Sequence, residues 1–581
     1  MTLPLLPQDD PQGDRRGAAL AWAQQAYTYR YDALAPLATI ANLPATEHFD
    51  IRYNALQLGT MSRISANMGM VTVRNDLEPF QGLQEYEEFY PLLPKPSSLS
   101  NHHDDRSFAR QRVAGANPMV LRRVIDAREL ADMDLAGQFT AITGLPSLEA
   151  GVASGQLFVA DYRMFADTVT GTHGGRPKWL APAVALFCWR PSGLADRGGL
   201  APVAIRLSPR SVTVTPKDGA AWQAAKTHVQ VADANHHEMS THLGRTHLVM
   251  EPFAIATARQ LAPNHPLRLL LDPHLRFNLA RNALARETLI KQDGPVDRLL
   301  AGTLQSSLKI ATEAAASWHF ENFKLPNELK SRGVDNADLL PDYPYRDDGL
   351  LLWDSIGAFA REYVGLYYSS PASVQGDVEV QAWRTEISAQ NGGRILGVPE
   401  EVATPDALAA ILQQIIFTTG PQHSAVNYPQ WDFRWSSGQH ASCGLRLFRT
   451  SAQQHGYSFG RRASHPAAAG PGTRPDRSHA IPDRMAVRPP RQLPQGSLRG
   501  SQGASRGVAI SGRSQPRGAA DSRPKHPTRP ALRVSASVEH PEQQQHLRGA
   551  RNTSSIRRAV WVTLDWQRVP APHPCGPSAS N

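Results

Sequence analysis

A run of histidines at the start of an apolar helix is the feature that most constrains how this chain can fold. Residues 235–247 read NHHEMSTHLGRTH, and the apolar stretch LVMEPFAIATARQL follows directly. This stretch predicts a buried helix, and imidazoles in a buried helix need hydrogen-bond or metal partners. The segment therefore holds either hydrogen-bonded core histidines or a metal site.

The spacing of these histidines indicates which kinds of metal site are possible. A zinc-protease motif, HExxH, needs histidines four residues apart, whereas His237 and His242 are five apart. His242 and His247 are also five apart. In an α-helix that spacing leaves two side chains about 140° apart. They can share one ion only where the helix widens into a π-bulge, a feature often found at functional sites.

A second predicted helix carries QHSAVNYPQ at 422–430, where His423 and Asn427 share a face. Alone, such a pair is usually a capping or core pair. Nitrogen and oxygen ligands without thiolate suit iron or manganese better than a structural zinc site. The three cysteines, Cys188, Cys443 and Cys575, cannot supply a disulfide framework or a cysteine-based zinc site.

The rest of the pattern predicts a mainly helical body with a β-rich insertion. Residues 1–18 are rich in Pro, Gly, Asp and Arg and predict a disordered N-terminus. The short runs QLFVADYRMF, PAVALFCW, APVAIRLS and SVTVTP, between 156 and 215, predict strands. Long helices are predicted at Glu238–Leu261, Leu267–Ile290, Leu351–Tyr367 and Pro405–Phe433. We find neither a stretch of about 18 apolar residues nor a secretory signal, which indicates a soluble protein.

The composition changes after Phe433. Residues 434–581 hold 22 Arg, one Lys and six acidic residues, a net charge of +17, whereas residues 1–433 carry a net charge of −8. The overall charge is therefore no evidence that the body binds nucleic acid. A basic tail that binds nucleic acid usually mixes Lys with Arg. The Arg-rich, Pro-rich composition is instead typical of GC-rich coding sequence read in the wrong frame.

Five ordered blocks between residues 107 and 433 resemble the lipoxygenase family. The histidine run and the Glu-Pro that follows it match the signature His-Glu-x-x-x-His-Leu-x-x-Thr-His-x-x-x-Glu-Pro. The other blocks are SFARQRVAGANPMVL (107–121), NHPLRLLLDPHLRFNLARNALARETLI (264–290), DYPYRDDGLLLWDSIGAFAREYVGLYY (342–368) and QHSAVNYPQWDF (422–433). The resemblance implies a mainly α lipoxygenase-type catalytic domain over 19–433, with a small β-rich subdomain and no N-terminal β-sandwich domain.

The resemblance also implies a non-haem iron (Fe2+/Fe3+) centre. His242, His247 and His423 match the imidazole ligands of the family, and Asn427 matches a weaker fourth oxygen ligand. His237 falls on a recurrent position that does not bind the metal.

Further positions take their roles from the same resemblance. Glu238, where the family often has Gln, and Gln430 would orient the ligands. Ala285 falls on the stereocontrol site, where alanine implies mainly an S-configured hydroperoxide. Leu289 and Val296 fall on positions that line the apolar channel beside the iron, although ordinary core packing explains them nearly as well.

The activity that the resemblance implies is dioxygenation of polyunsaturated fatty acids such as linoleate or arachidonate. A ferric ion bearing hydroxide takes a hydrogen atom from the doubly allylic carbon, and O2 then adds to the pentadienyl radical. No side chain is implied as a catalytic group beyond the metal-bound hydroxide. We expect a cytoplasmic monomer with no nucleic-acid partner. The alternative is a catalytically dead lipoxygenase-like binding protein.

The chain departs from the family at its C-terminus. Lipoxygenases end in an isoleucine whose terminal carboxylate is an iron ligand, whereas this chain ends at Asn581. Read one nucleotide later, the codons for 438–446 can give A-N-M-P-L-A-A-Y. Those from 531 to 548 can give P-Y-E-Y-L-L-P-S-N-I-P-N-S-x-x-I and a stop. Both resemble the family, so we expect a frameshift near Phe433, a disordered tail over 434–581 and poor activity of the chain as printed.

Overall fold

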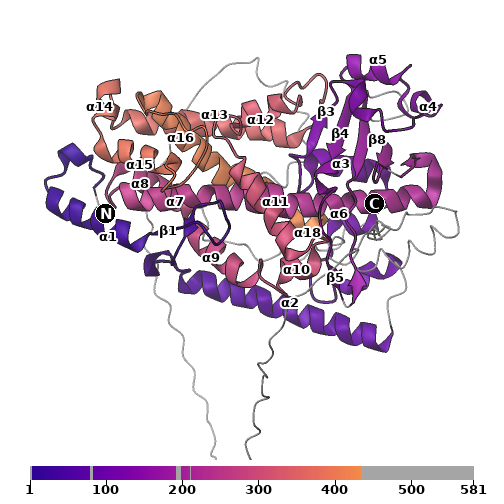
Figure 1. Cartoon of the computed structure of the whole chain (residues 1–581), viewed down its shortest axis with the longest axis horizontal. Coiled ribbons are helices and arrows are strands. Elements are labelled where there is room, and N and C mark those ends of the chain that lie inside the picture. The colour runs from indigo at the N-terminus through magenta and orange to yellow at the C-terminus, as the bar shows by residue number, and fades with distance from the viewer. Residues whose placement is uncertain are drawn as a thin grey trace, which may run out of the picture. The chain divides into compact units, whose positions relative to one another are not determined.

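The computed structural model describes residues 3–433, except 79–82, 136, 174, 192–197 and 210. The described part is mainly helical and contains a small antiparallel sheet, as predicted (Figure 1). The predicted frameshift and the predicted disorder of residues 434–581 lie outside the described residues.

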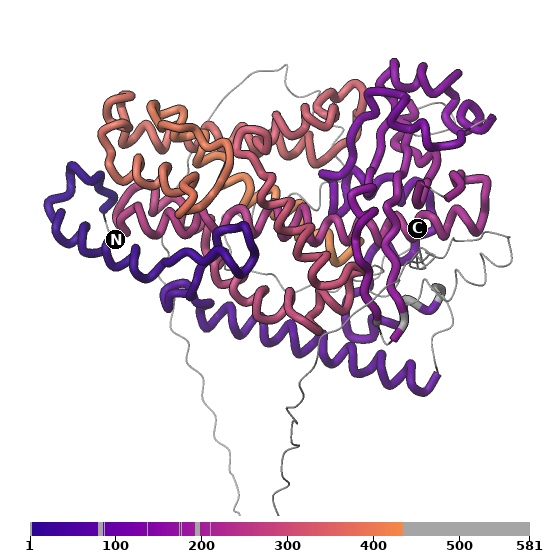
Figure 2. Tube along the Cα trace, viewed as in Figure 1, coloured from indigo at the N-terminus to yellow at the C-terminus, as the bar shows by residue number. Residues whose placement is uncertain are grey.

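A continuous helical rod runs through this body. It consists of α6 (Gly219–His236), the π-helix η8 (His237–Leu248) and α7 (Val249–Gln260). The side chains of α7 are buried from Val249 to Ala258, in agreement with the apolar sequence. In Figure 2 the rod is surrounded by later helices, of which α11 (Leu304–Ala316) contacts η8 and α15 (Val378–Ser388) contacts α7. The rod can therefore hold polar side chains away from water.

Some of the remaining helices contact the rod, among them α1, α8 and α9, and others contact the sheet or one another. The longer ones are α1 (Gly13–Ala26), α2 (Ile51–Leu77), α3 (Asp105–Ala114), α8 (Pro266–Leu275), α9 (Asn278–Thr288), α13 (Pro344–Gly365) and α16 (Pro405–Phe417). The shorter ones are α4 (Phe139–Thr143), α5 (Leu148–Ala153), α10 (Pro295–Leu299), α12 (Leu325–Ser331), α14 (Pro371–Gln375), α17 (His423–Asn427) and α18 (Gln430–Phe433). A second π-helix, η9 (Thr418–Gln422), joins α16 to α17.

The five-stranded sheet has the order β3-β4-β7-β8-β9, and each neighbouring pair is antiparallel. Its strands are β3 (Leu121–Arg123), β4 (Leu157–Asp161), β7 (Val184–Arg190), β8 (Gly199–Arg206) and β9 (Thr213–Val214). Two small ribbons pair β1 (Tyr29–Arg30) with β2 (Thr39–Ile40), and β5 (Thr172–His173) with β6 (Arg176–Pro177). The predicted strands between 156 and 215 are confirmed.

The central strands are buried on both faces. In β4, Phe158 and Ala160 join the main core, whereas Leu157 and Val159 join a second apolar cluster. Successive side chains of a strand point to opposite faces, so a strand between two cores needs a continuous apolar run. The run LFVA has this pattern, which explains why its sequence does not alternate with polar residues.

The prediction that residues 1–18 are disordered is wrong for the described residues 3–18. Helix α1 begins at Gly13, and the Arg16 side chain is buried against α15. Its guanidinium makes a bidentate ion pair with Glu379 and donates to Asn264 Oδ1 at 3.0 Å and Asp10 Oδ2 at 3.0 Å. The N-terminal segment is held in place by partners of Arg16 that are distant in the sequence. The local composition of residues 1–18 cannot indicate such partners.

The single helix predicted at Leu267–Ile290 is instead two helices. Helix α8 ends at Leu275, and α9 begins at Asn278 after Phe277, whose φ is +63°. A left-handed residue interrupts helical hydrogen bonding, so the chain changes direction there. The helix predicted at Pro405–Phe433 likewise ends at Asn427, shortly before Pro429, and α18 follows.

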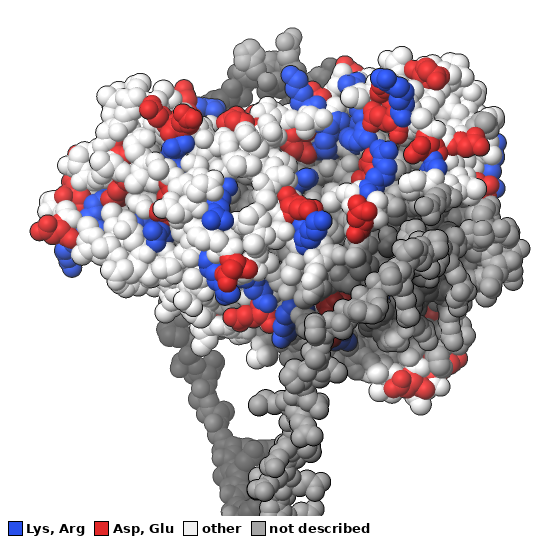
Figure 3. All heavy atoms as spheres, in the orientation of Figure 1, with Lys and Arg blue, Asp and Glu red and all other residues white. Residues whose placement is uncertain are grey.

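Charges of both signs are mixed on the face shown in Figure 3. That face has no extended field of one sign among the residues drawn in colour. Within the described residues, no helix combines the length and the apolar character needed to span a bilayer.

Replacing Arg16 with Gln should lower the free energy of unfolding by about 3 kcal/mol, because Glu379 would keep a buried charge without its cation. The matched control is Arg15→Gln, since Arg15 is exposed and its side chain contacts only Gln12. That change should cost less than about 0.5 kcal/mol. Urea denaturation of both variants measures the difference. Equal stability of the two variants would show that the N-terminal segment is not fixed as described.

Candidate metal centre

Two π-helical segments position the histidines. The first, η8, contains both His242 and His247, and the second, η9, ends directly before His423. In a π-helix, residues five apart are hydrogen-bonded one turn apart, so their side chains lie on one face. The widened helix that the sequence required for a shared ion is confirmed.

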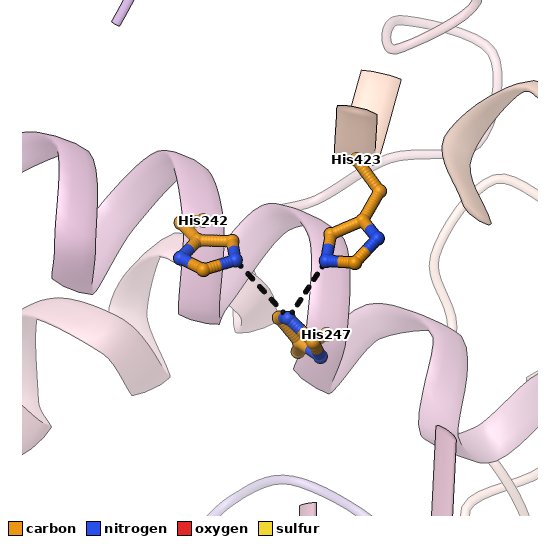
Figure 4. A group of neighbouring side chains, drawn as sticks. All are labelled: His242, His247 and His423. Carbon is orange, nitrogen blue, oxygen red and sulfur yellow. Dashed lines mark hydrogen bonds between the residues drawn. The ribbon is translucent and has the colours of Figure 1, made fainter. Parts of the chain in front are cut away.

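The three histidine rings converge through single nitrogen atoms (Figure 4). His247 Nε2 lies 3.2 Å from His242 Nε2 and 3.1 Å from His423 Nε2. The contacting nitrogens of all three residues lie within 4.8 Å of one another. Two imidazoles bound at right angles to one ion, with bonds of about 2.1 Å, place their nitrogens about 3.0 Å apart. The observed separations fit that arrangement.

Hydrogen bonding alone does not satisfy this cluster. An imidazole nitrogen has one in-plane position, which holds either a proton or a lone pair. His247 Nε2 therefore cannot donate to one neighbour and accept from the other. A cation bound by three lone pairs satisfies all three nitrogens at once.

Burial keeps the imidazoles of His247 and His423 neutral. It lowers the pKa of His247 well below its usual range, and the neighbouring His242 and His423 lower it further. Burial also lowers the pKa of His423 to about 3, with further contributions from His242 and Arg281. Neutral imidazoles offer the lone pairs that metal ligation requires.

Both residues predicted to orient the ligands lie beside His242. The Gln430 side-chain amide is 3.0 Å from His242 Nδ1, and Glu238 Oε2 is 3.5 Å from the same nitrogen. His237 Nε2 instead contacts the Val426 carbonyl at 2.7 Å. His237 thus points its ring at the backbone of α17 and ties η8 to the segment that carries His423.

Asn427 is the last residue of α17 and follows His423 by one helical turn. It is half-buried, and its side chain makes no hydrogen bond to another residue of the described part of the chain. Its role as a fourth ligand stays a prediction.

Sequence reasoning missed the polar contacts that hold the backbone of His247. Two asparagine side chains of α9 reach the His247 carbonyl, and Asn278 Nδ2 lies 3.4 Å from it. Asn282 Nδ2 donates to the His247 carbonyl at 3.1 Å and to Glu251 Oε2 at 2.8 Å. Glu251 also accepts from Arg286 at 2.9 Å. The polar residues in RNALAR (281–286) were the only sequence signal for these contacts, and their partners, the His247 carbonyl and Glu251, become known only from the fold.

Of the predicted stereocontrol and channel residues, Ala285 lies near the C-terminal end of α9, Leu289 directly follows this helix, and Val296 lies on α10. Ala285 is half-buried; its carbonyl accepts from Leu289 N–H at 2.8 Å, and the Leu289 carbonyl accepts from Val296 N–H at 3.1 Å. Leu289 is exposed (45%), so ordinary core packing does not explain it, whereas Val296 lies in the main core. A channel lined by these residues stays a prediction.

Comparison with known proteins gives one consistent result. The family model described as Lipoxygenase matches residues 62–447. The linoleate 9/13-lipoxygenase of Pseudomonas aeruginosa is 38% identical over 364 residues, which cover 60% of this chain and 52% of that protein. The human hydroperoxide isomerase ALOXE3 is 38% identical over 343 residues, covering 57% of this chain and 46% of that protein.

Solved structures agree with this result. A lipoxygenase crystallised anaerobically with arachidonate has a TM-score of 0.67 and 27% identity, covering 75% of this chain and 68% of that one. Coral 8R-lipoxygenase gives a TM-score of 0.67 at 27% identity, covering 75% and 67%.

The helical fold and the three converging imidazoles define a helical protein with an internal histidine cluster that could hold a metal ion. The chain belongs to the lipoxygenase family. It spans about half the length of the curated relatives that it matches.

The lowered histidine pKa values predict that the metal-free chain loses stability in acid. The unfolded chain takes up protons below about pH 6.5, whereas folded His423, with a pKa of about 3, does not. The free energy of unfolding should therefore fall as the pH drops from about 6.5 toward about 3.

His423→Asn should reduce this slope by up to about 1.4 kcal/mol per pH unit. Denaturant titrations of the metal-free protein across this range measure it, with the exposed His48→Asn as the control. Slopes that do not differ between the wild type and His423→Asn would contradict the described burial.

Proposed function

We propose that this chain is a lipoxygenase whose histidine cluster holds one non-haem iron and that it oxygenates polyunsaturated fatty acids. The observation that carries the proposal is the position of His247 Nε2, which lies 3.2 Å from His242 Nε2 on the same π-helix and 3.1 Å from Nε2 of His423, the residue directly after the second π-helix. The similarity to a bacterial linoleate 9/13-lipoxygenase, and to a lipoxygenase structure that contains arachidonate, supports the substrate class.

His242, His247 and His423 would bind the iron through Nε2, and Asn427 would add a weaker oxygen ligand. When bound, the iron would supply one-electron chemistry, taking an electron as a base takes the proton from the doubly allylic carbon of the fatty acid. Dioxygen would add to the resulting pentadienyl radical, and return of that electron and proton would give the hydroperoxide.

The protein side chains orient the ligands. With His242 bound through Nε2, its Nδ1 carries the proton and needs an acceptor. The Glu238 carboxylate is one acceptor, and the Gln430 amide is another when its oxygen faces the ring. Asn282 fixes the carbonyl of His247, so both ligands of η8 are held in one orientation.

Ala285, Leu289 and Val296 would set the position of the fatty acid. Ala285 lies on α9, and Asn282 of the same helix contacts the His247 backbone. Helix α9 would therefore position both the fatty acid and the metal-binding His247. We propose mainly S-configured hydroperoxides on the strength of alanine at this position.

We also propose that residues 434–581 are read out of frame. In the alternative frame, the codons for 438–446 and 531–548 can give lipoxygenase-like sequence, the second followed by a stop, and the family match ends at residue 447. Resequencing the locus tests this proposal, and an alternative frame without these motifs would exclude it.

The purified chain loaded anaerobically with Fe(II) should hold about one iron per chain, measured by elemental analysis after gel filtration. His247→Asn should lose most of this iron, because the ring that contacts both other imidazoles is removed. The exposed His48→Asn is the control and should retain it. Wild-type protein without bound iron would contradict the proposed centre.

A frame-restored chain should convert linoleate to conjugated diene hydroperoxide, seen as ultraviolet absorbance, with mainly S product on a chiral column. The chain as printed should be at least about ten-fold slower, because it lacks the lipoxygenase-like segment. Equal rates for the two chains would contradict the frame proposal. The absence of hydroperoxide from an iron-loaded, frame-restored chain would instead favour a binding protein.

A further inference from the structure

A buried polar network contacts the π-helix η8 at Thr241. Its members come from α3, from the loop after α3, from the end of β4 and from α6. They are Arg112, Asn117, Tyr162 and Asp233, with relative exposures of 0, 1, 0 and 2%. Burial of so many polar groups is costly unless each finds a partner.

An ion pair anchors this network. Arg112 lies 3.1 Å from Asp233 Oδ1, and Tyr162 donates its hydroxyl to the same oxygen at 2.7 Å. Burial lowers the pKa of Arg112, but the Asp233 carboxylate and the Tyr162 hydroxyl together outweigh it, and the pKa is raised. Arg112 therefore keeps its charge beside Asp233 although both side chains are buried.

Asn117 connects this anchor to the π-helix. Its Nδ2 donates to Asp233 Oδ1 at 2.8 Å, and its Oδ1 accepts from the Thr241 hydroxyl at 3.1 Å. Because this amide donates to the ion pair and accepts from the helix, it fixes the position of Thr241 relative to the Arg112–Asp233 pair.

Thr241 is the point at which the network meets the widened turn. Its single hydroxyl proton is shared between Asn117 Oδ1 and the His237 carbonyl, which lies at 3.0 Å, and the Thr241 carbonyl accepts from the Thr246 hydroxyl at 2.8 Å. Thr241 directly precedes His242, and Thr246 directly precedes His247. The two hydroxyl groups thus bracket the turn that separates the two ligands.

We propose that Asn117 and Thr241 are positioning residues, which hold the π-helical turn in the rotation that lets His242 and His247 bind one metal ion. The inference rests on the proposed function, because the geometry that it protects is that of the metal centre. Without the Thr241–Asn117 bond, the turn keeps its burial but loses its link to the Arg112–Asp233 ion pair.

The test is the metal affinity of the full chain, with Co(II) as a spectroscopic probe in competition with a chelator. Thr241→Val removes the hydroxyl at nearly constant volume, and Thr241→Ser restores it. The control is Thr257→Val on α7, which removes a buried hydroxyl bonded to the Trp383 indole at 3.0 Å, away from the histidines. Thermal denaturation of the metal-free proteins measures the cost to the fold.

Thr241→Val should bind Co(II) about 10–100-fold more weakly, with a changed visible absorption spectrum. Thr241→Ser should stay within about three-fold of wild type, and Thr257→Val should lose stability while keeping its affinity. If Thr241→Val does not fold, Asn117→Ser supplies the same comparison. Equal affinities for Thr241→Val and Thr257→Val would overturn the positioning role. Failure of the wild-type chain to bind metal would instead contradict the proposed function.

Discussion

The rest of the site depends on one departure from α-helical geometry. His242 and His247 are five residues apart, and in an α-helix their rings would diverge by about 140°. The π-helix η8 places them on one face, where their Nε2 atoms lie 3.2 Å apart. His423 reaches the same point from a second π-helical segment. A π-helix is rare and persists only where surrounding contacts determine it.

Those contacts come from both sides of the rod. Asn282 bonds the His247 carbonyl and is itself held by Glu251. On the other side, Asn117 connects Thr241 to the Arg112–Asp233 ion pair. Buried polar groups that bond to one another favour one arrangement, because an alternative would leave a charge or an amide without its partner. The buried polar residues thus determine the geometry of the π-helical turn, and the apolar residues around them keep it away from water.

Much of this could be predicted from the sequence, because the decisive signals are local. The spacing of His242 and His247 required a widened helix, and the apolar run after them required burial. The strand runs were predicted in the correct segment. The long-range partners could not be predicted: nothing near Arg16 in the sequence indicates Glu379, and nothing near Thr241 indicates Asn117. The interruption at Phe277 was missed for a different reason, since a left-handed residue in an apolar helical pattern carries no compositional signal.

The central claim is that three imidazoles from η8 and α17 share one ion. Anomalous X-ray scattering at the iron edge, from crystals of the iron-loaded chain, tests it most directly. The account predicts one peak within about 2.3 Å of Nε2 of His242, His247 and His423. A peak elsewhere, or rings turned away from one another in iron-loaded crystals, would contradict it.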